Sequence, residues 1–158
     1  MHNKLINAFN PLPHNEQQIL QMLAVIYAPT AQTALQALLK KALDLKPTIT
    51  GLIDKNLRGK LLKSGLIITP AEGWLCHPDI SEYLMRLAVQ QSWFTTLAAF
   101  LLAETRFYYY ADRDTLFYVI RRLRLFLYQG NSKGFADETK RIYALKPQEL
   151  PTLFNSLF

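Results

Sequence analysis

Cysteine is almost absent from this sequence, and that absence excludes several classes of protein. Cys76 is the single cysteine, so the chain cannot form an intramolecular disulfide. The three histidines, at positions 2, 14 and 77, are too few and too dispersed to close a metal site with that thiol. We therefore predict no metal site and no cofactor.

Long apolar runs are also lacking. The most apolar stretch, Trp93 to Ala103, is well short of the roughly 18 to 20 residues that a membrane span needs. The first residues contain Asn and Pro and do not resemble a secretory signal. These features predict a cytoplasmic protein that makes no contact with a membrane.

Groups arranged for catalysis are missing as well. Cys76 and His77 are adjacent, but neighbouring side chains on a strand point to opposite faces, so we expect a structural role. Two pairs of carboxylates stand where helices are expected to begin, a position that favours capping: Asp112 with Asp114, and Asp137 with Glu138. The sequence predicts no catalytic residues and no enzyme.

What is present is an apolar and mildly basic composition. Half of the 158 residues (50%) are hydrophobic and 19% are charged, which is typical of a folded domain and excludes a disordered tail. The length fits one ordinary domain, or a small domain with a helical extension. The formal charge of +6 favours contact with a polyanion.

Two amphipathic helices are predicted in the first third of the chain. Asn15 is expected to cap the first, whose apolar residues from Ile19 to Ile26 repeat with helical period and form one buried face. Ala28 and Pro29 end it. Thr30 is expected to cap the second, which carries an apolar stripe as far as Ala42.

A third helix and a β-hairpin are predicted next. The helix is expected to begin after Thr48 and to end at Ser64 and Gly65, with one apolar stripe formed by Ile49, Ile53, Leu57 and Leu61. Residues 66–76 then read as a hairpin around a Pro and Gly turn, with Trp74 buried on the return strand. Three helices followed by a hairpin is the order of a winged helix-turn-helix.

The rest of the chain is expected to be helical. Asp79 or Ser81 is predicted to cap a long helix running toward Glu104, followed by a helix from about Asp112 to Tyr128. Two shorter helices follow, in residues 135–145 and from 147 onward. We therefore predict a mainly α fold: a lead-in over residues 1–14, a winged-helix domain over 15–78, and an α-helical extension over 79–158 packed on it. The terminal apolar run, 153–158, is expected of a fragment of a longer chain.

Two segments resemble known families. The string from Leu57 to Ile67, LRGKLLKSGLI, resembles the end of a winged-helix recognition helix running into its wing, and the similarity covers Asn15 to Cys76. The string FNPLP at residues 9–13, followed by EQQILQMLA at 16–24, resembles N-terminal regions of bacterial Swi/Snf-type helicases. No Gly-rich phosphate loop and no acidic helicase box occur, so this resemblance implies an accessory role beside DNA or beside the motor, without ATP chemistry.

The first candidate nucleic-acid-binding surface is the third helix. Its cations are Lys55, Arg58, Lys60 and Lys63, with Lys46 nearby and only Asp54 opposing them. In a major groove, such a helix would set its cations against phosphates and allow Arg58 to reach a base edge. Leu62 shares that face and Glu72 stands at the tip of the wing, where phosphates would be repelled. A solvated or covered basic face is therefore the alternative.

The second candidate surface is a stripe on one later helix: Phe117, Arg121, Arg124 and Tyr128. Aromatic rings with arginines suit stacking on unpaired bases, or a protein contact rich in Tyr and Arg. The alternative is that the arginines lie along aromatic rings within the fold. We also expect at least one ring among Tyr108, Tyr109 and Tyr110 to be exposed or at an interface.

These observations predict a non-catalytic accessory module of a larger, helicase-like protein. Its predicted partners are double-stranded DNA and further domains of the same polypeptide, and it would touch DNA or position a motor. The alternative function is a protein-interaction scaffold whose winged helix no longer binds nucleic acid.

Overall fold

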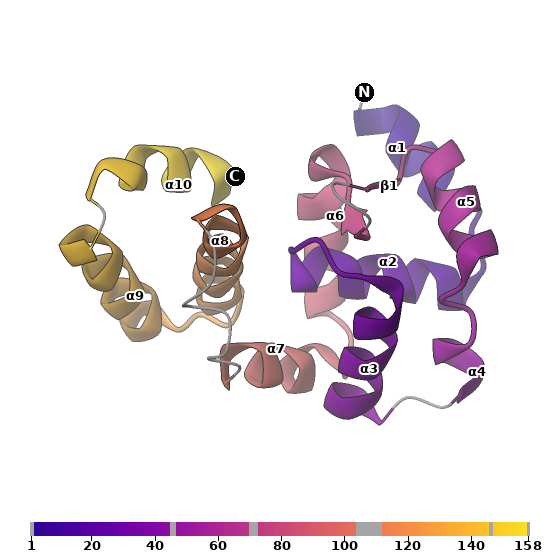
Figure 1. The fold of residues 1–158 in the computed structure, drawn as a ribbon, viewed down its shortest axis with the longest axis horizontal. Coiled ribbons are helices and arrows are strands. Elements are labelled where there is room, and N and C mark those ends of the chain that lie inside the picture. Colours follow the sequence, from indigo (N-terminus) through magenta and orange to yellow (C-terminus); the bar gives the residue numbers. More distant parts are fainter. Residues whose placement is uncertain (1, 45–46, 70–72, 104–111, 146, 158) are drawn as a thin grey trace. The chain divides into compact units, whose positions relative to one another are not determined.

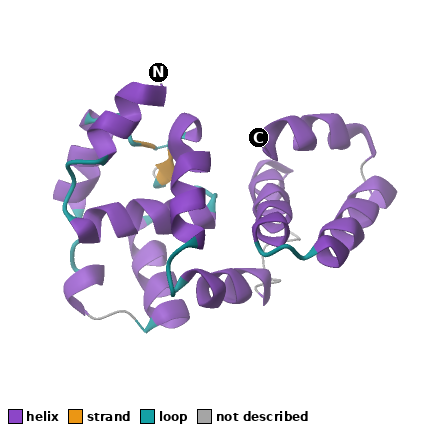
Figure 2. Cartoon of the chain, turned by 180° about the vertical axis from the view of Figure 1, so that it is seen from behind, coloured by secondary structure: helices purple, strands orange, loops and turns teal. Residues whose placement is uncertain are grey.

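The computed structural model describes residues 2–44, 47–69, 73–103, 112–145 and 147–157. Those residues form helices and one small sheet (Figure 2), so the predicted mainly α class is confirmed. The chain divides into two compact units, Met1–Leu97 and Ala98–Phe158 (Figure 1). The first unit thus extends beyond residue 78, where we placed the end of the winged-helix domain.

The lead-in is helical. Helix α1 (His2–Phe9) buries Leu5 and Phe9 and packs against α6 (Pro78–Val89). The turn into α2 (His14–Ile26) is held by Gln17, whose Nε2 donates to the carbonyl oxygen of Asn10 at 2.9 Å. The predicted cap at Asn15 is wrong, because α2 starts at His14 and has no side-chain cap.

Helix α2 is the centre of the first unit. Every residue from Ile19 to Ile26 is buried, including Gln21, whereas the sequence predicted one buried face. The reason is that α6 packs along α2 and the second strand of the sheet also contacts it, so the remaining apolar residues are covered too. A helix that is apolar on all sides is a buried helix.

Helix α3 (Gln32–Leu43) buries Leu35 and Leu39 of the predicted stripe, while Leu38 and Ala42 are half-buried and Ala34 is exposed. Thr30 does not cap it, because the N-cap residue is Ala31 and no side chain bonds there. Instead, the backbone of Thr30 pairs with that of Trp74 through two hydrogen bonds, of 2.7 and 3.0 Å. This pairing ties the turn between α2 and α3 to the sheet.

The third predicted helix is interrupted. A short helix, α4 (Pro47–Thr50), is followed by a turn and then by α5 (Lys55–Lys63). The carboxylate of Asp54 accepts from the backbone N–H of Leu57 at 2.8 Å, which caps α5. Gln36 donates to the carbonyl of Ile53 at 2.8 Å and satisfies the turn. The single helix predicted from Thr48 to Ser64 is therefore wrong in its first part.

The hairpin follows α5, as predicted. Strands β1 (Ile67–Ile68) and β2 (Leu75–Cys76) are antiparallel, with Ile67 opposite Cys76. Trp74 is 0% exposed, which confirms its predicted burial. Residues 70–72, among them Glu72, lie outside the described residues.

The long helix predicted over residues 79–104 is divided into α6 and α7 (Phe94–Ala103). Helix α6 ends at the polar pair of Gln90 and Gln91, whose backbone N–H groups bond to carbonyls of its last turn. Its N-cap is His77, whose Nδ1 accepts from the backbone N–H of Asp79 at 3.2 Å. The predicted capping by Asp79 or Ser81 is therefore wrong.

The second unit contains α8 (Asp112–Tyr128), α9 (Ser132–Leu145), a 3-10 turn (Pro147–Glu149) and α10 (Leu150–Leu157). Helix α8 packs against both α9 and α10. Gly130, with a φ of 65°, follows α8, and Asn131 accepts from the N–H of Gly134 at 2.8 Å at the start of α9. The side chains of Asp112 and Asp114 lie outside the described residues, so their predicted capping role stays a prediction.

Glu138 has a different place from the one predicted. Helix α9 begins at Ser132, so Glu138 lies beyond its first turn and does not cap it. Its side chain is 5% exposed and pairs with Arg122 of α8 at 3.2 Å and with Arg141 at 2.6 Å. Arg122 also donates to the carbonyl of Leu102 at 2.7 Å. A buried ion pair thus joins α8 to α9.

We predict that Gly73→Ala destabilises the first unit. An added Cβ would meet the backbone N of Thr30 at 2.9 Å and the carbonyl carbon of Pro29 at 3.1 Å, and neither can move without disturbing the Thr30 bridge. The expected loss of unfolding free energy is about 1 to 3 kcal/mol, measured by urea denaturation. Thr33→Ala, on the exposed side of α3, is the control that should lose nothing. Equal midpoints for Gly73→Ala and wild type would show that this backbone approach is not tight.

Candidate nucleic-acid interface

Helix α5 has one buried and one exposed face. Leu57 and Leu61 are 6% and 0% exposed and attach the helix to the core. Lys55, Lys60 and Lys63 are exposed, and α5 lies at the right-hand edge of the first unit in Figure 1. The Asp54 cap fixes where the helix starts and therefore which way each of these residues faces. The structure thus presents three of the four predicted cations to solvent.

Arg58, the fourth predicted cation, is only half-exposed. It follows Leu57 directly and lies at the margin of the buried face, where its Nε is buried and makes no hydrogen bond. Leu62, which would be covered in the alternative of a covered basic face, is 38% exposed. The outward face of α5 therefore combines lysines with one exposed leucine.

Lys60 is held by an acidic side chain from another helix. Its Nζ lies 2.6 Å from Oε2 of Glu16 on α2, and the two side chains are 49% and 16% exposed. Sequence reasoning missed this pair because the residues are 44 positions apart. Any phosphate that binds Lys60 must compete with the Glu16 carboxylate.

A shallow hollow beside the start of α5 has the wrong charge for an anion. It has a volume of about 250 Å³, and its lining includes Glu16, Asp54 and Lys60. Two carboxylates against one lysine would repel a phosphate there. Lys55 and Lys63 do not line this hollow, so we place the candidate phosphate contacts on their side of α5.

The second candidate stripe is largely buried. Arg121 and Arg124 are 3% and 4% exposed, and Tyr128 is half-buried. The guanidinium of Arg121 lies 4.7 Å from the centre of the Tyr118 ring, a cation–π contact within α8. Arg122, which sequence reasoning did not single out, lies 5.4 Å from the Phe126 ring. These contacts favour the alternative in which the arginines hold rings inside the fold.

Two predicted features of this region lie outside what the structure describes. The side chain of Phe117 is one, and the tyrosines at 108, 109 and 110 are the other.

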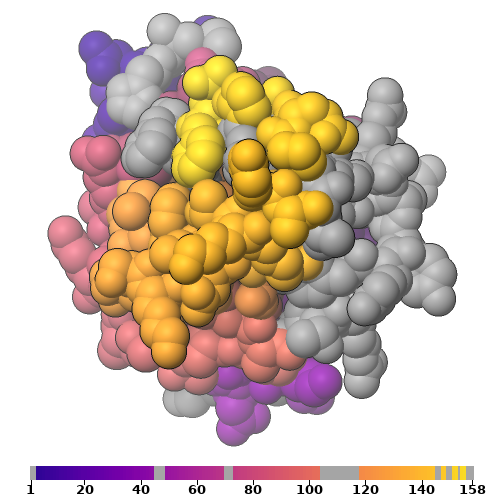
Figure 3. All heavy atoms as spheres, turned by 90° about the vertical axis from the view of Figure 1, so that its left-hand side faces the viewer, coloured from indigo at the N-terminus to yellow at the C-terminus, as the bar shows by residue number. Residues whose placement is uncertain are grey.

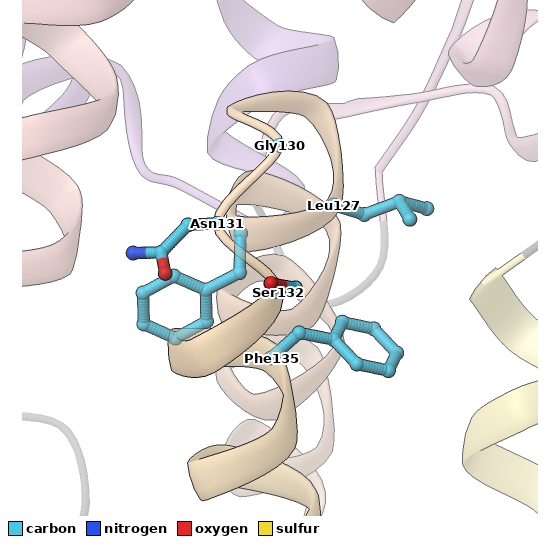
Figure 4. A pocket seen from close by; sticks show the side chains of 6 residues that line it. Leu127, Gly130, Asn131, Ser132 and Phe135 are labelled. Carbon is cyan, nitrogen blue, oxygen red and sulfur yellow. The ribbon is translucent and has the colours of Figure 1, made fainter.

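A small apolar hollow opens where α8 turns into α9. Six residues line it: Phe126, Leu127, Gly130, Asn131, Ser132 and Phe135. Its volume is about 230 Å³, and Leu127 and Phe135 extend to the same side of it (Figure 4). Leu127 is 42% exposed and Tyr143, farther along α9, is 65% exposed. Leu127 and Tyr143 are thus exposed apolar groups on the second unit, whose later described helices are orange to yellow in Figure 3.

Cys76 and His77 serve separate tasks. Cys76 is 1% exposed and its thiol lies 3.8 Å from the carbonyl oxygen of His77, while the imidazole of His77 caps α6. Across the described ranges, no group of three His, Cys, Asp or Glu side chains is arranged to hold a metal ion. Within the same ranges, no helix has the length and apolarity needed to cross a membrane.

No protein-family model, curated protein or solved structure matches this chain. The function is therefore inferred from the geometry of α5 and of the two units.

We predict that Arg124→Ala lowers the stability of the second unit. The whole side chain is buried, so its removal leaves a cavity and deprives its neighbours of contacts, at a cost of roughly 1 to 3 kcal/mol. Arg86→Ala is the matched control, because Arg86 is exposed and its pair with Glu82 should contribute less than about 1 kcal/mol. Thermal melts followed by circular dichroism measure both. Equal melting temperatures for the two variants would return Arg124 to the list of surface candidates.

Proposed function

We propose that this chain is a non-catalytic accessory module that contacts duplex DNA through α5. The observation that carries the proposal is the division of that helix into a face anchored by Leu57 and Leu61 and a face with three exposed lysines. Lysines held on a rigid helix can neutralise phosphates with little rearrangement of the fold.

The arrangement around α5 supports a winged helix. Helices α2, α3 and α5 are followed by the β1–β2 hairpin, and α5 packs against β1. The bridge from Thr30 to Trp74 adds an extended residue between the first two of these helices to the edge of the hairpin. In DNA-binding helix-turn-helix folds the last helix of the motif is the one that enters the major groove, and here that helix is α5.

The positive charge of this surface is modest and is concentrated on α5. Of the four cations of α5, Lys60 is paired with Glu16, and the one carboxylate within the same segment, Asp54, has its Oδ1 engaged in capping. Each phosphate neutralised releases condensed counterions, so even three or four contacts give affinity that falls steeply with salt. Non-specific binding in the micromolar range, about 10⁻⁴ to 10⁻⁶ M, is what such a surface supports.

The resemblance of residues 9–24 to N-terminal regions of bacterial Swi/Snf-type helicases supports a place beside a DNA motor. In this proposal further domains of the same polypeptide supply the motor, and the module holds DNA or positions it. The burial of Cys76 and the capping role of His77 are consistent with a module that performs no chemistry of its own.

A second candidate function is a protein-interaction scaffold. The apolar hollow where α8 turns into α9, with the exposed Leu127 in its lining, favours it. Apolar groups exposed near one another often mark protein contacts. A chain that fails to bind duplex DNA at low salt would make this function the leading one.

The first test is salt-dependent binding to a mixed-sequence duplex, followed by fluorescence anisotropy. Lys55→Ala with Lys63→Ala should weaken binding and reduce the slope of log K against log salt by roughly two, about one unit for each lost phosphate contact. Lys40→Ala with Lys133→Ala removes the same charge from exposed sites on α3 and α9 and should leave the slope unchanged. An unaltered slope in the α5 variant would reject α5 as the contact surface.

The second test concerns Lys60. Glu16→Gln removes the carboxylate that competes with phosphate, so duplex affinity should rise and the salt slope should steepen by roughly one. Glu82→Gln on α6 makes the same change of charge at another ion pair and should alter neither quantity. Weaker binding by Glu16→Gln would contradict competition between Glu16 and phosphate. It would show that the ion pair orients Lys60 toward DNA.

A further inference from the structure

Gly59 stands in the middle of α5 without a structural reason inside the chain. A Cβ built there would meet nothing within 4 Å, so no neighbour excludes a side chain. Its backbone is not in the left-handed region, unlike that of Gly65, whose φ is 75°. Glycine in a helix interior is less stable than alanine. The fold therefore gains nothing from Gly59 that the described contacts can account for.

The neighbours of Gly59 on the helix surface form a consistent pattern. Lys55 and Lys63 lie one turn before and one turn after it, and both are exposed. Leu62 lies three residues on, on the same side, and is 38% exposed. Gly59 and Leu62 thus make an uncharged strip between two lysines, on the side of α5 away from Leu57 and Leu61.

We propose that Gly59 and Leu62 mark the line along which α5 lies deepest in the major groove of duplex DNA. The missing side chain at Gly59 lets the helix backbone approach the floor of the groove. Leu62 contacts the C5-methyl group of thymine, which is the apolar feature that the major groove presents. This inference rests on the proposed function and adds to it the depth of insertion and the base that is contacted.

The dimensions agree with this placement. Eight residues separate Lys55 from Lys63, which is about 12 Å along a helix axis at 1.5 Å per residue. The major groove is wide enough to admit an α-helix, so lysines at the two ends of the strip stay within reach of the phosphates that border the groove. Leu62, an unusual residue for a surface that only touches phosphates, then has an apolar partner.

The first experiment enlarges position 59 in the full chain. Because the space around it is open, Gly59→Ala should fold and should melt about 2 to 6 °C higher than the wild type. We expect its affinity for a mixed-sequence duplex to fall about threefold, and that of Gly59→Leu about tenfold or more, because each side chain lifts the helix from the groove.

Asn7→Ala, at an exposed position inside α1, is the control for the gain in helix stability and should bind as the wild type does. A Gly59→Ala chain that melts at a higher temperature and binds the duplex more weakly is expected only if DNA approaches Gly59. Wild-type affinity in both Gly59 variants would overturn the inference while leaving binding through the lysines intact. A wild-type chain that does not bind duplex DNA would overturn the proposed function itself.

The second experiment removes only the methyl groups of the DNA. A duplex of identical sequence with uracil in place of thymine should bind the wild type about threefold more weakly, the effect of losing one buried methyl contact. Leu62→Ala should bind the two duplexes equally. Equal binding of both duplexes by the wild type would exclude the thymine contact. An RNA duplex, whose major groove is too deep and narrow for side chains, should bind at least tenfold more weakly than DNA, and equal binding would exclude insertion altogether.

Discussion

The burial of α2 on every side is the constraint on which the first unit depends. Its residues from Ile19 to Ile26 are enclosed, with α6 packed along the helix and β2 against it. Helix α5 contributes Leu57 and Leu61 to the core. Apart from the half-buried Arg58, the other residues of α5 are exposed, and the helix is held in place by the Asp54 cap and by the ion pair from Lys60 to Glu16. The candidate interface is thus a consequence of how the core is filled.

Periodicity predicted the parts of the fold in which local pattern and tertiary packing agree. The stripe of α3, the bounds of α8 and the hairpin with Trp74 inside belong to this class. Periodicity failed where an interruption of the helix left the spacing of the apolar residues unchanged. Ile53 is buried as the stripe from Ile49 to Leu61 required, yet it lies in the turn between α4 and α5, so the period itself could not reveal the interruption. Asp54 was the available signal, since it is a favoured N-cap residue.

Contacts between residues far apart in the sequence could not be predicted, for a different reason. Nothing local distinguishes Glu16, which neutralises Lys60, or Glu138, which lies buried between two arginines, from carboxylates at the start of a helix. The stripe of Arg121 and Arg124 was ambiguous because arginine stems pack on rings as readily as they bind phosphate. Of the candidate site, the sequence alone therefore identified the helix and its lysines, but neither the restraint on Lys60 nor the exposure of Arg58.

The pairing of α2 with α6 has a consequence for how the chain acquires its structure during synthesis. The stretch between Ile26 and Pro78 must be made before the two helices can meet, and the bridge from Thr30 to Trp74 closes a similarly long loop. Closing such loops costs entropy before any contact compensates it. The ribosome adds about 5 to 20 residues per second. Synthesis of this stretch therefore takes several seconds, during which α2 cannot pack against α6. The second unit, in which α8 and α9 are joined by a tight turn, has no comparable delay within that pair.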